Sequence, residues 1–376
     1  MKNFKLMQII PSLESGGVEQ GTLDVANYLA EREIQNYIIS NGGNMLPYLK
    51  KKNIEHFTLP VHSKNFLGMP LVAKKINKII LNKKINILHI RSRAPAWLLP
   101  YIDKKKLKCV STFHNVYGTQ NIFKKIYNKR LSKVDHIVAI SEYVKNQIVE
   151  KYKISPNKIK IINRGTDVNH FNPKISNQTE FAHFLNNKNI LPDKKIILFP
   201  GRLTDWKGQI NFLKIVEHFK SDPIIFYFVG DDKNTSYRDK LLNIIRKKNL
   251  NKTCKILGHM NKNDLKMMYY CSDIVISAPL KPEGFGRIVS ESLAMQKIIL
   301  AYNFGGVENQ LKGLDSLYKI KPYDHDELKE KITHVMNLSK NQIEKLGLIA
   351  RQHVISKYSR DKMLQKYYDF YEGILN

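Results

Sequence analysis

The sequence predicts an α/β protein made of two doubly wound domains, each a largely parallel sheet covered by helices. Its 376 residues are too many for one ordinary hydrophobic core. Apolar runs of strand length alternate with amphipathic runs of helix length, which is typical of βαβ units. The alternation lapses near residue 170 and then starts again. We therefore expect two such domains, joined near that point.

The first alternation begins with "FKLMQII" at 4–10, which predicts a strand, followed by a predicted helix at 18–33. Apolar residues recur at helical spacing along that helix and should face the core: Val18, Leu23, Val25, Ala26, Leu29 and Ala30. Helical segments are expected between further strands at 37–40, 85–91, 108–113, 136–141 and 158–163.

A polar, Asn-rich stretch from Arg164 to Asp193 separates the two alternations. The second alternation predicts helices that start at Lys207 and cover 236–249 and 261–271. It predicts strands at 195–201, 223–230, 254–258, 273–277 and 297–301. The tail at 359–375 has the wide apolar face of a terminal helix and should pack back on the first domain. The expected domains are 1–170, 171–358 and the terminal helix 359–376.

Composition excludes several classes of protein. An apolar fraction of 43% with 10% aromatic residues is typical of a globular chain. The chain contains no run of eighteen apolar residues, and its start is too interrupted for a signal peptide, so we expect a cytoplasmic protein. Its three cysteines are far apart and form no CxxC pair, which argues against disulfides and against a zinc site.

The charge is strongly positive, with 62 basic and 33 acidic residues and a net charge of +29. Residues 1–170 hold 29 basic and 11 acidic residues, against 33 and 22 in the rest. Such an excess favours nucleic acid, an anionic lipid surface or an anionic substrate as a partner. No nucleic-acid motif accompanies it, so nucleic acid is not expected. Solvated lysines in a lysine-rich composition are the plain alternative.

Open parallel sheets bind ligands at the carboxyl ends of their strands, so the loops there are the places to look for chemistry. After the first strand, Gly16 and Gly17 open a helix whose amides can approach a phosphate or a sugar. This pair is not GxGxxG, so dinucleotide binding is not supported. A tight turn with a purely structural role explains the pair equally simply.

Two cations follow the first strand of the second domain, in "GRLTDWKGQ". Arg202 lies in the loop and Lys207 at the start of the next helix. A guanidinium can fork across two oxygens while an ammonium supplies a compact charge, which suits a diphosphate. Ordinary surface cations are the alternative for either residue alone.

Two carboxylates bracket a glycine-rich turn in "EGFGRIVSE". Main-chain amides of Gly284, Phe285 and Gly286 can point at an anion, and a helix begins near Arg287. Glu283 before the turn can accept from sugar hydroxyls, and Glu291 inside the helix from a ribose diol. The combination favours a sugar nucleotide, although two exposed glutamates on a surface helix are the alternative.

Several segments of the sequence resemble those of a known protein family. The segment "PEGFGRIVSE" resembles the E-x7-E segment of retaining glycosyltransferases of family 4, which adopt the GT-B fold of two facing Rossmann-like domains with a cleft between them. In the second domain, "PGRLTDWKGQ", "FVGDD", "ILGHM", "YYCSDIVIS" and "AYNFGGVENQ" follow in the expected order. In the first domain, "HIRSRAPAWL" and "TFHNVYG" look like members that act in lipopolysaccharide core assembly, including mannosyltransferase-like proteins.

The resemblance implies donor-binding roles in the second domain. Arg202 and Lys207 would hold the diphosphate, assisted by the amides of the helix start at Gly286, Arg287 and Ile288. Glu283 would bind the transferred sugar as a catalytic residue, Glu291 would bind the ribose, and the backbone near His259 and Met260 would meet the base.

The resemblance also implies roles in the first domain. Gly17 would approach the diphosphate, and His114 would bind the donor sugar near the reacting carbon as a catalytic residue. Arg91 and Arg93, at the carboxyl end of a strand, can meet a phosphate or carboxylate of the acceptor. A structural pair that bonds to nearby backbone is the alternative for these arginines.

The implied reaction moves a hexose, from GDP-mannose or a UDP-hexose, to a lipid-linked or lipopolysaccharide core acceptor with retention at the anomeric carbon. No DxD motif is evident, because Asp231 and Asp232 are adjacent, so no metal is expected and the nucleotide sugar acts as donor substrate. The basic first domain favours a peripheral position at the inner face of the cytoplasmic membrane. The rivals are a sugar-nucleotide epimerase of the same fold and a basic module that binds lipid or nucleic acid.

Overall fold

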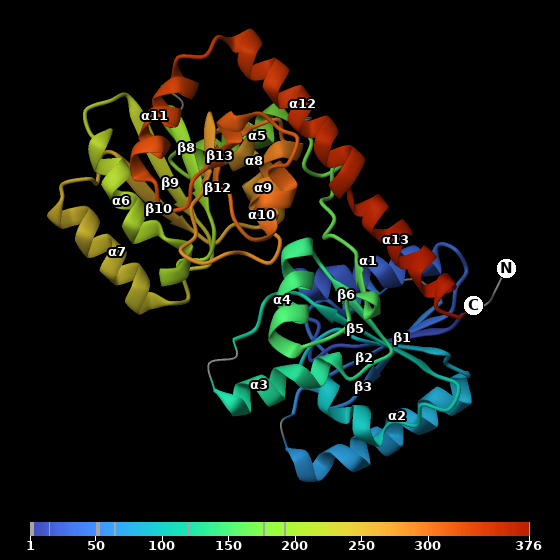
Figure 1. The fold of residues 1–376 in the computed structure, drawn as a ribbon. Coiled ribbons are helices and arrows are strands. Elements are labelled where there is room, and N and C mark those ends of the chain that lie inside the picture. The colour runs from blue at the N-terminus through green and yellow to red at the C-terminus, as the bar shows by residue number, and fades with distance from the viewer. Residues whose placement is uncertain are drawn as a thin grey trace. The chain divides into compact units, whose positions relative to one another are not determined.

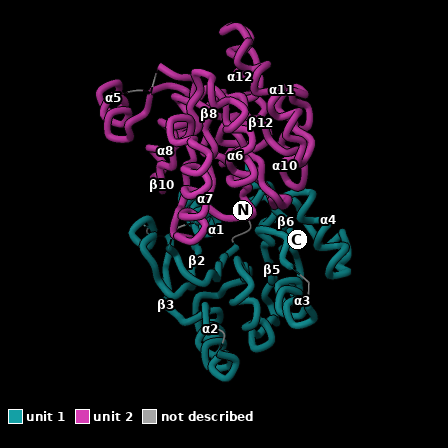
Figure 2. Tube along the Cα trace, turned by 90° about the vertical axis from the view of Figure 1, so that its left-hand side faces the viewer, with its two compact units in different colours: residues 1–164, 361–376 teal, residues 165–360 magenta. Residues whose placement is uncertain are grey.

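The chain divides into two compact units in the computed structural model, which describes residues 4–14, 16–49, 53–63, 65–118, 121–175, 177–191 and 193–375. Unit 1 holds residues 1–164 and 361–376, and unit 2 holds 165–360 (Figures 1 and 2). The units change at 164/165 and 360/361, where the sequence placed its boundaries at 170/171 and 358/359. The terminal segment belongs to unit 1.

Unit 1 is built on a seven-stranded sheet in the order β3-β2-β1-β4-β5-β6-β7, and every pair of neighbours in it is parallel. The strands are β1 (Leu6–Ile9), β2 (Asn36–Ser40), β3 (Ile54–Thr58), β4 (Ile87–Ile90), β5 (Lys108–Phe113), β6 (His136–Ala139) and β7 (Ile159–Ile161). The α-helices are α1 (Gly17–Ala30), α2 (Met69–Lys83), α3 (Ile122–Lys129), α4 (Glu142–Tyr152) and α13 (Arg360–Gly373). Short 3₁₀ helices include η2 (Phe66–Gly68), η3 (Pro95–Tyr101) and η4 (Arg130–Ser132).

Crossover handedness places the helices of unit 1. Connections between parallel strands are right-handed, so the face on which a helix lies depends on the direction in which the chain steps along the sheet. The chain steps one way from β1 to β3 and the opposite way from β3 to β7. Helix α1 therefore covers one face of the sheet, while α2, η3, α3 and α4 cover the other.

The terminal helix completes the core of unit 1. Met363, Leu364, Tyr367 and Tyr371 of α13 pack with Leu6 of β1 and Leu29 of α1 in one buried cluster. The ring of Phe4 lies 5.8 Å from that of Tyr371. Residues at opposite ends of the chain thus share one core, which agrees with the apolar face that the sequence shows at 359–375.

Unit 2 contains a six-stranded sheet in the order β10-β9-β8-β11-β12-β13, again with parallel neighbours. Its strands are β8 (Lys195–Pro200), β9 (Ile224–Val229), β10 (Cys254–Gly258), β11 (Ile274–Ser277), β12 (Ile298–Tyr302) and β13 (Lys319–Ile320). Its helices are α5 (Gln178–Asn187), α6 (Gln209–His218), α7 (Thr235–Lys247), α8 (Lys262–Cys271), α9 (Arg287–Ala294), α10 (Gly306–Leu311), α11 (His325–Met336) and α12 (Lys340–Tyr358), with the 3₁₀ helix η6 at Asp205–Lys207. All six residues of β9 are buried, as expected for a strand covered on both faces.

The doubly wound parallel sheets that the sequence predicts are confirmed. The structure also contains elements that were not predicted, namely β3, β13, α5, α10, α11 and α12, and two of them show why. Strand β3 has the sequence IEHFT and lies half-buried at a sheet edge, so it lacks the apolar run that marks the other strands. Helix α5 lies in the polar stretch between the alternations, where Phe184 is its buried residue. In the described part of the chain, no helix is both long and apolar enough to cross a membrane.

Candidate functional site

The carboxyl ends of β8 and β11, neighbours in the sheet of unit 2, bring two of the predicted loops together. Lys207 of the loop after β8 donates to the Glu283 carboxylate of the loop after β11 at 2.5 Å. Both side chains are largely buried, at 11% and 12% exposed. The Leu280 amide also donates to the carbonyl of Trp206 at 2.7 Å. A cation and a carboxylate predicted separately from the sequence therefore lie in direct contact.

The close approach of these loops depends on Gly208, between η6 and α6. Gly208 has a φ of +85°, in the left-handed region that favours glycine. A Cβ atom there would lie 2.4 Å from the carbonyl oxygen of Ala278, which is backbone and cannot yield. The glycine thus lets the loop after β8 lie against the loop after β11, and this contact positions Lys207.

A second glycine forms the start of α9. Gly286 has a φ of +86° and immediately precedes the first helical residue, Arg287. The Gln310 side chain donates to the carbonyls of Phe285 and Gly286, and the Gly306 amide donates to the carbonyl of Glu283 at 2.8 Å. The donors to these three carbonyls, the Gln310 side chain and the Gly306 amide, both belong to α10, and their hydrogen bonds fix the shape of the turn. The partial positive charge of the helix start then lies next to Glu283 and Lys207.

Glu291 lies inside α9 and is 4% exposed. One carboxylate oxygen accepts from the Tyr269 hydroxyl at 3.1 Å, and the other from Arg287, one helical turn earlier, at 2.7 Å. Burial, and next the charge of Glu291, raise the pKa of Tyr269 well above its usual value, so the hydroxyl remains a donor. The carboxylate is thereby held in one orientation by two side chains.

The other predicted donor-site residues of unit 2 differ in whether their side chains are exposed or buried. Arg202 and His259 are exposed. Met260 is 7% exposed and Phe285 4%, and the Phe285 ring packs 5.8 Å from that of Tyr358. For Met260 and Phe285, only backbone atoms are therefore suited to meet a ligand.

In unit 1, Arg164 joins two of the predicted residues. Its Nη1 donates to the carbonyl of Gly17, the first residue of α1, at 2.6 Å, and its Nη2 lies 3.2 Å from Nδ1 of His114. His114 directly follows β5, and its Nε2 atom is buried. Burial, and next the charges of Arg164 and Arg91, hold the pKa of His114 well below its usual value, so the ring is neutral at pH 7.

The two arginines after β4 are in different surroundings. Arg91 is 1% exposed, donates from Nε to the Thr22 hydroxyl at 3.2 Å and lies over the Tyr367 ring. Its buried Nη1 has no hydrogen-bond partner among the described residues. Arg93 is half-buried and donates to the Asn128 side chain at 2.9 Å. Of this pair, Arg93 is the residue with surface to offer an acceptor.

Three residues that hold this geometry were not predicted from the sequence: Arg164, Tyr269 and Gln310. Arg164 comes shortly after a predicted strand, as loop residues at carboxyl ends do, and that position was the available signal. Tyr269 and Gln310 lie within "YYCSDIVIS" and "AYNFGGVENQ", two of the segments that carry the family resemblance, and that was the available signal. Their polar contacts come only from the packing.

Asp231 and Asp232, the adjacent carboxylates that follow β9, both contact neighbouring groups. Asp232 pairs with Arg238 at 3.5 Å, and Asp231 accepts from the Lys233 amide at 3.0 Å. Within the described residues, no group of three or more His, Cys, Asp or Glu side chains lies together as metal ligands would.

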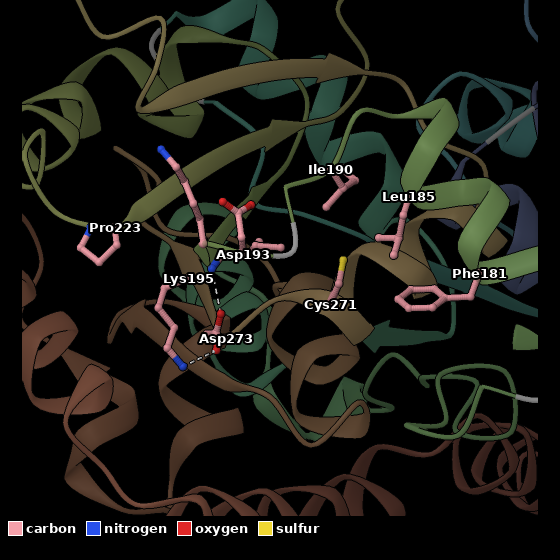
Figure 3. Close-up of a pocket in the computed structure, with 10 residues that line it drawn as sticks. Phe181, Leu185, Ile190, Asp193, Lys195, Pro223, Cys271 and Asp273 are labelled. Carbon is pink, nitrogen blue, oxygen red and sulfur yellow. Dashed lines mark hydrogen bonds and ion pairs between the residues drawn. The ribbon is translucent and has the colours of Figure 1, made fainter.

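Figure 3 shows a pocket of about 560 Å³ in unit 2 that lies away from these loops. Lys195, Pro223 and Asp273 line it, and each stands at the amino end of its strand, β8, β9 or β11. Phe181 and Leu185 of α5 form an apolar wall. The predicted residues stand at the opposite, carboxyl ends of the same sheet, so this pocket is not the candidate site.

Unit 1 also carries a basic face with exposed apolar side chains. Between Glu55 and Asp135 the chain holds 17 basic residues and a single acidic one, Asp103. Helix α3 exposes Phe123 at 80% and Ile126 at 54%, with Lys124 and Lys125 exposed between them. We call α3 and η2, together with the exposed side of α2, the basic face.

Aromatic contacts join the parts of the basic face. The ring of Trp97 in η3 lies 5.1 Å from that of Phe66 in η2 and 5.7 Å from that of Tyr127 in α3. Leu67 of η2 is 91% exposed. Along α2, Leu71 and Leu81 stand exposed among lysines, and its second half lines a groove of about 1080 Å³ with residues 103–107.

Comparison with known proteins adds independent findings. Residues 181–353 match the family model "Glycosyl transferases group 1", and residues 15–170 match "Glycosyltransferase Family 4". A crystal structure of a glycosyltransferase from Rickettsia africae is 33% identical, with a TM-score of 0.90 and 100% of both chains covered. Anabaena HepE, solved in complex with UDP and glucose, is 16% identical, with a TM-score of 0.80 over 98% of this chain and 100% of the other.

A further relative comes from the sequence comparison. The lipopolysaccharide 1,2-N-acetylglucosaminetransferase of Salmonella typhimurium is 24% identical over 188 residues. The match covers 48% of each of the two chains.

Proposed function

Because the chain belongs to the glycosyltransferases of group 1 and family 4 and has their GT-B fold, we propose that it moves a hexose from a nucleotide-diphosphate sugar to a lipid-linked or lipopolysaccharide core acceptor. The donor is GDP-mannose or a UDP-hexose, and the anomeric configuration is retained. An enzyme that transfers a glycosyl group accounts for the paired loops of unit 2, which a module that only binds lipid would not require.

The observation that carries this proposal is the contact of Lys207 with Glu283 beside the start of α9. Transfer of a sugar leaves a nucleoside diphosphate, on which negative charge develops in the transition state. Arg202, Lys207 and the first amides of α9 offer donors to that charge, and a fixed helix start needs no reorganisation to do so. Glu283 offers an acceptor to hydroxyls of the sugar next to the same cations.

We propose that the nucleoside of the donor binds at Glu291, one helical turn after the start of α9. Tyr269 and Arg287 orient the Glu291 carboxylate, which can accept two hydrogen bonds from a ribose diol. The backbone at His259 and Met260 is proposed to meet the base. The roles toward the donor's diphosphate and sugar that the family resemblance gives to Gly17 and His114 of unit 1 are part of the proposal.

The chemistry requires a proton acceptor for the acceptor hydroxyl. In the proposed retaining reaction, both bonds are exchanged on one face of the sugar ring, and a donor phosphate oxygen takes the proton. A protein nucleophile is then not needed, and cations at the diphosphate serve in place of a metal. Arg93 is proposed to bind a negative group of the acceptor.

The membrane part of the proposal is supported by the basic face of unit 1. Lysines near an anionic bilayer contribute roughly 1 kcal/mol each, and exposed apolar side chains such as Phe123 and Leu67 can enter the interface between headgroups and acyl chains. A lipid-linked acceptor would be presented at that surface. We therefore place the enzyme at the inner face of the cytoplasmic membrane, as a peripheral protein.

The proposal is tested by incubating the enzyme with GDP-mannose, UDP-glucose and UDP-N-acetylglucosamine in turn, with truncated lipopolysaccharide core as acceptor. We expect one donor to be consumed, with a product whose new linkage has the donor's anomeric configuration, determined from the one-bond ¹³C–¹H coupling at the anomeric carbon. Glu283→Gln should lower the rate by at least 100-fold. Inversion, or conversion of a donor to its epimer without an acceptor, would contradict the proposal, and the latter would favour an epimerase.

A further inference from the structure

Arg164 makes two contacts that bear on how His114 is used. It follows β7, and its guanidinium donates with one nitrogen to the carbonyl of Gly17 and lies 3.2 Å from Nδ1 of His114 with another. One side chain thus links the first residue of α1 to the residue after β5. Both linked residues belong to the donor-site prediction, whereas Arg164 does not.

The hydrogen positions on His114 follow from this contact. A guanidinium has five N–H donors and no acceptor, so Nδ1 must be the acceptor in its bond with Arg164. A neutral imidazole whose Nδ1 accepts carries its hydrogen on Nε2. The Nε2 atom is buried and has no hydrogen-bond partner among the residues that the structure describes. The backbone of Arg91 is the protein group that faces the ring, but it makes no well-formed hydrogen bond with Nε2. His114 therefore offers a buried N–H donor that lacks a well-formed partner among the described residues.

We infer that Arg164 is a positioning residue that holds His114 as the Nε2–H tautomer, so that the imidazole donates a hydrogen bond to an oxygen of the transferred sugar. This inference rests on the proposed function, which assigns His114 to the donor sugar. It excludes a role of His114 as a general base through Nε2, because that atom already carries a hydrogen.

Gly21 provides the room for the guanidinium. A Cβ atom at Gly21 in α1 would lie 2.6 Å from Nη1 of Arg164 and 3.4 Å from Nη2 of Arg91. The atoms it would meet are the ends of flexible side chains, so Arg164 would shift while the helix stayed. Gly21→Ala hence displaces Arg164 without changing its charge, and alanine favours the helix more than glycine does.

The tautomer can be measured directly, without any substrate. The measurement is ¹⁵N NMR of protein labelled with ¹⁵N-histidine, in which the chemical shift of a ring nitrogen shows whether it carries a hydrogen. Comparison with His114→Gln identifies the signals of His114. We expect Nε2–H in the wild-type protein and a mixture of tautomers in both Arg164→Met and Gly21→Ala. Arg32→Met is the matched control, because Arg32 is an exposed arginine in the turn after α1, and its guanidinium stacks on Tyr28.

Kinetics then separate positioning from folding. Gly21→Ala should melt at or above the temperature of Arg164→Met, because alanine favours the helix. It should nevertheless lower kcat by about tenfold, the cost of one lost hydrogen bond. Arg164→Lys should restore part of the loss in Arg164→Met, since an ammonium can still donate to Nδ1. The control variant should retain the wild-type kcat and KM.

Two results would overturn the inference at the level of structure: Nδ1–H in the wild-type protein, or an unchanged Nε2–H tautomer in both Arg164→Met and Gly21→Ala. A third result is a changed tautomer with unchanged kcat and KM. That outcome would mean that His114 does not bind the donor sugar, and Arg164 would then have no positioning role in the reaction. Donor binding in unit 2, measured through Glu291→Gln, would still test the proposed function separately.

Discussion

Tyr269 shows how a residue outside the predicted site can decide its geometry. Its hydroxyl is one of two donors that orient the Glu291 carboxylate, and Tyr269 is fully buried. Tyr269→Phe removes this donor and leaves a nearly buried carboxylate short of a partner. Hydrogen bonds to charged groups contribute about 1.5–3 kcal/mol, so we expect unit 2 to lose about that much stability.

Kinetics of the same variant report on the role of Glu291. If Glu291 binds the ribose, Tyr269→Phe should raise the KM for the donor more than it changes kcat, because the carboxylate is free to turn. Tyr302→Phe, a buried tyrosine on β12 of the same unit, is the control. An unchanged donor KM together with an unchanged urea midpoint would contradict this account of Glu291.

His89 should make unit 1 sensitive to acid. The ring is fully buried between the Tyr371 hydroxyl at 2.6 Å and the Thr112 hydroxyl at 2.7 Å, and burial and then Arg91 hold its pKa well below the usual value. The folded state keeps His89 neutral while the unfolded state takes up a proton near pH 6.5, so stability is lost as the pH falls below about 6.5. The loss is up to about 1.4 kcal/mol per pH unit.

The measurement compares urea unfolding at about pH 7.5 and about pH 5.5 for the wild-type protein and His89→Gln. The other histidines contribute to both proteins, so the difference between the two pH dependences reports His89. We expect the wild-type protein to lose more stability by roughly 1 kcal/mol. Equal losses in the two proteins would mean that His89 takes up its proton in the folded state.

For single residues, the sequence predicts which side chains can bind a ligand better than it predicts which side chains contact one another. Glu283 and Lys207 stand out as a glutamate beside a glycine turn and a lysine after a strand, and parallel-sheet topology explains why they meet. The orientation of Glu291 by Tyr269 depends on how α8 packs against α9, which no local pattern expresses. Residues such as Phe285, whose ring is buried, look the same in sequence as residues that face a ligand.

Among the elements, α13 tests how far unit 1 depends on the end of the chain. Tyr371 of α13 is fully buried beside Phe4 and bonds to His89. Removal of a buried aromatic side chain costs about 3–5 kcal/mol, so Tyr371→Ala should destabilise unit 1 by that amount. Lys366→Ala, on the exposed side of the same helix, should change stability by less than about 0.5 kcal/mol.

The two tryptophans allow the units to be followed separately. Trp97 lies in unit 1 and Trp206 in unit 2, and the chain has no other tryptophan. In a Trp206→Phe background, urea unfolding monitored by fluorescence reports unit 1 alone. A Tyr371→Ala midpoint equal to that of Lys366→Ala would show that α13 adds nothing to the core of unit 1.

Elements were predictable from the sequence where the burial pattern is simple. Fully buried strands such as β9 have continuous apolar runs in the sequence. The start of α9 was predictable from the glycines that precede it. Edge strand β3 mixes charged and apolar residues because it is covered on fewer sides. Helix α5 buries little beyond Phe184, so its sequence has no clear apolar face. Partial burial, in both cases, weakens the pattern on which prediction depends.

Over the whole molecule, the excess positive charge is concentrated where apolar side chains are exposed, and this predicts binding to anionic vesicles. Phe123→Ser with Ile126→Ser should weaken binding to vesicles that contain phosphatidylglycerol by at least about tenfold, since two apolar anchors are lost. Added salt should weaken binding of the wild-type protein further, because the lysine contribution is screened. Zwitterionic vesicles should bind weakly in every case.

The matched control is Leu348→Ser with Ile349→Ser, which removes two exposed apolar side chains from α12 in unit 2. Co-sedimentation with vesicles measures both variants under the same conditions. Equal binding by the wild-type protein and the α3 variant would leave the basic face without a role at the membrane. Equal loss in the two variants would point to general hydrophobicity instead.

The central claim is that the loops at the carboxyl ends of β8 and β11, with α9, bind a nucleotide-diphosphate sugar. Thermal unfolding with UDP, GDP, ADP and their hexose conjugates tests it most directly, with Glu291→Gln measured alongside. The account predicts that one nucleotide stabilises the wild-type protein, by about 2.7 kcal/mol at a hundred times its Kd, and that the variant loses most of this effect. No stabilisation by any nucleotide, or equal stabilisation of the variant, would contradict it.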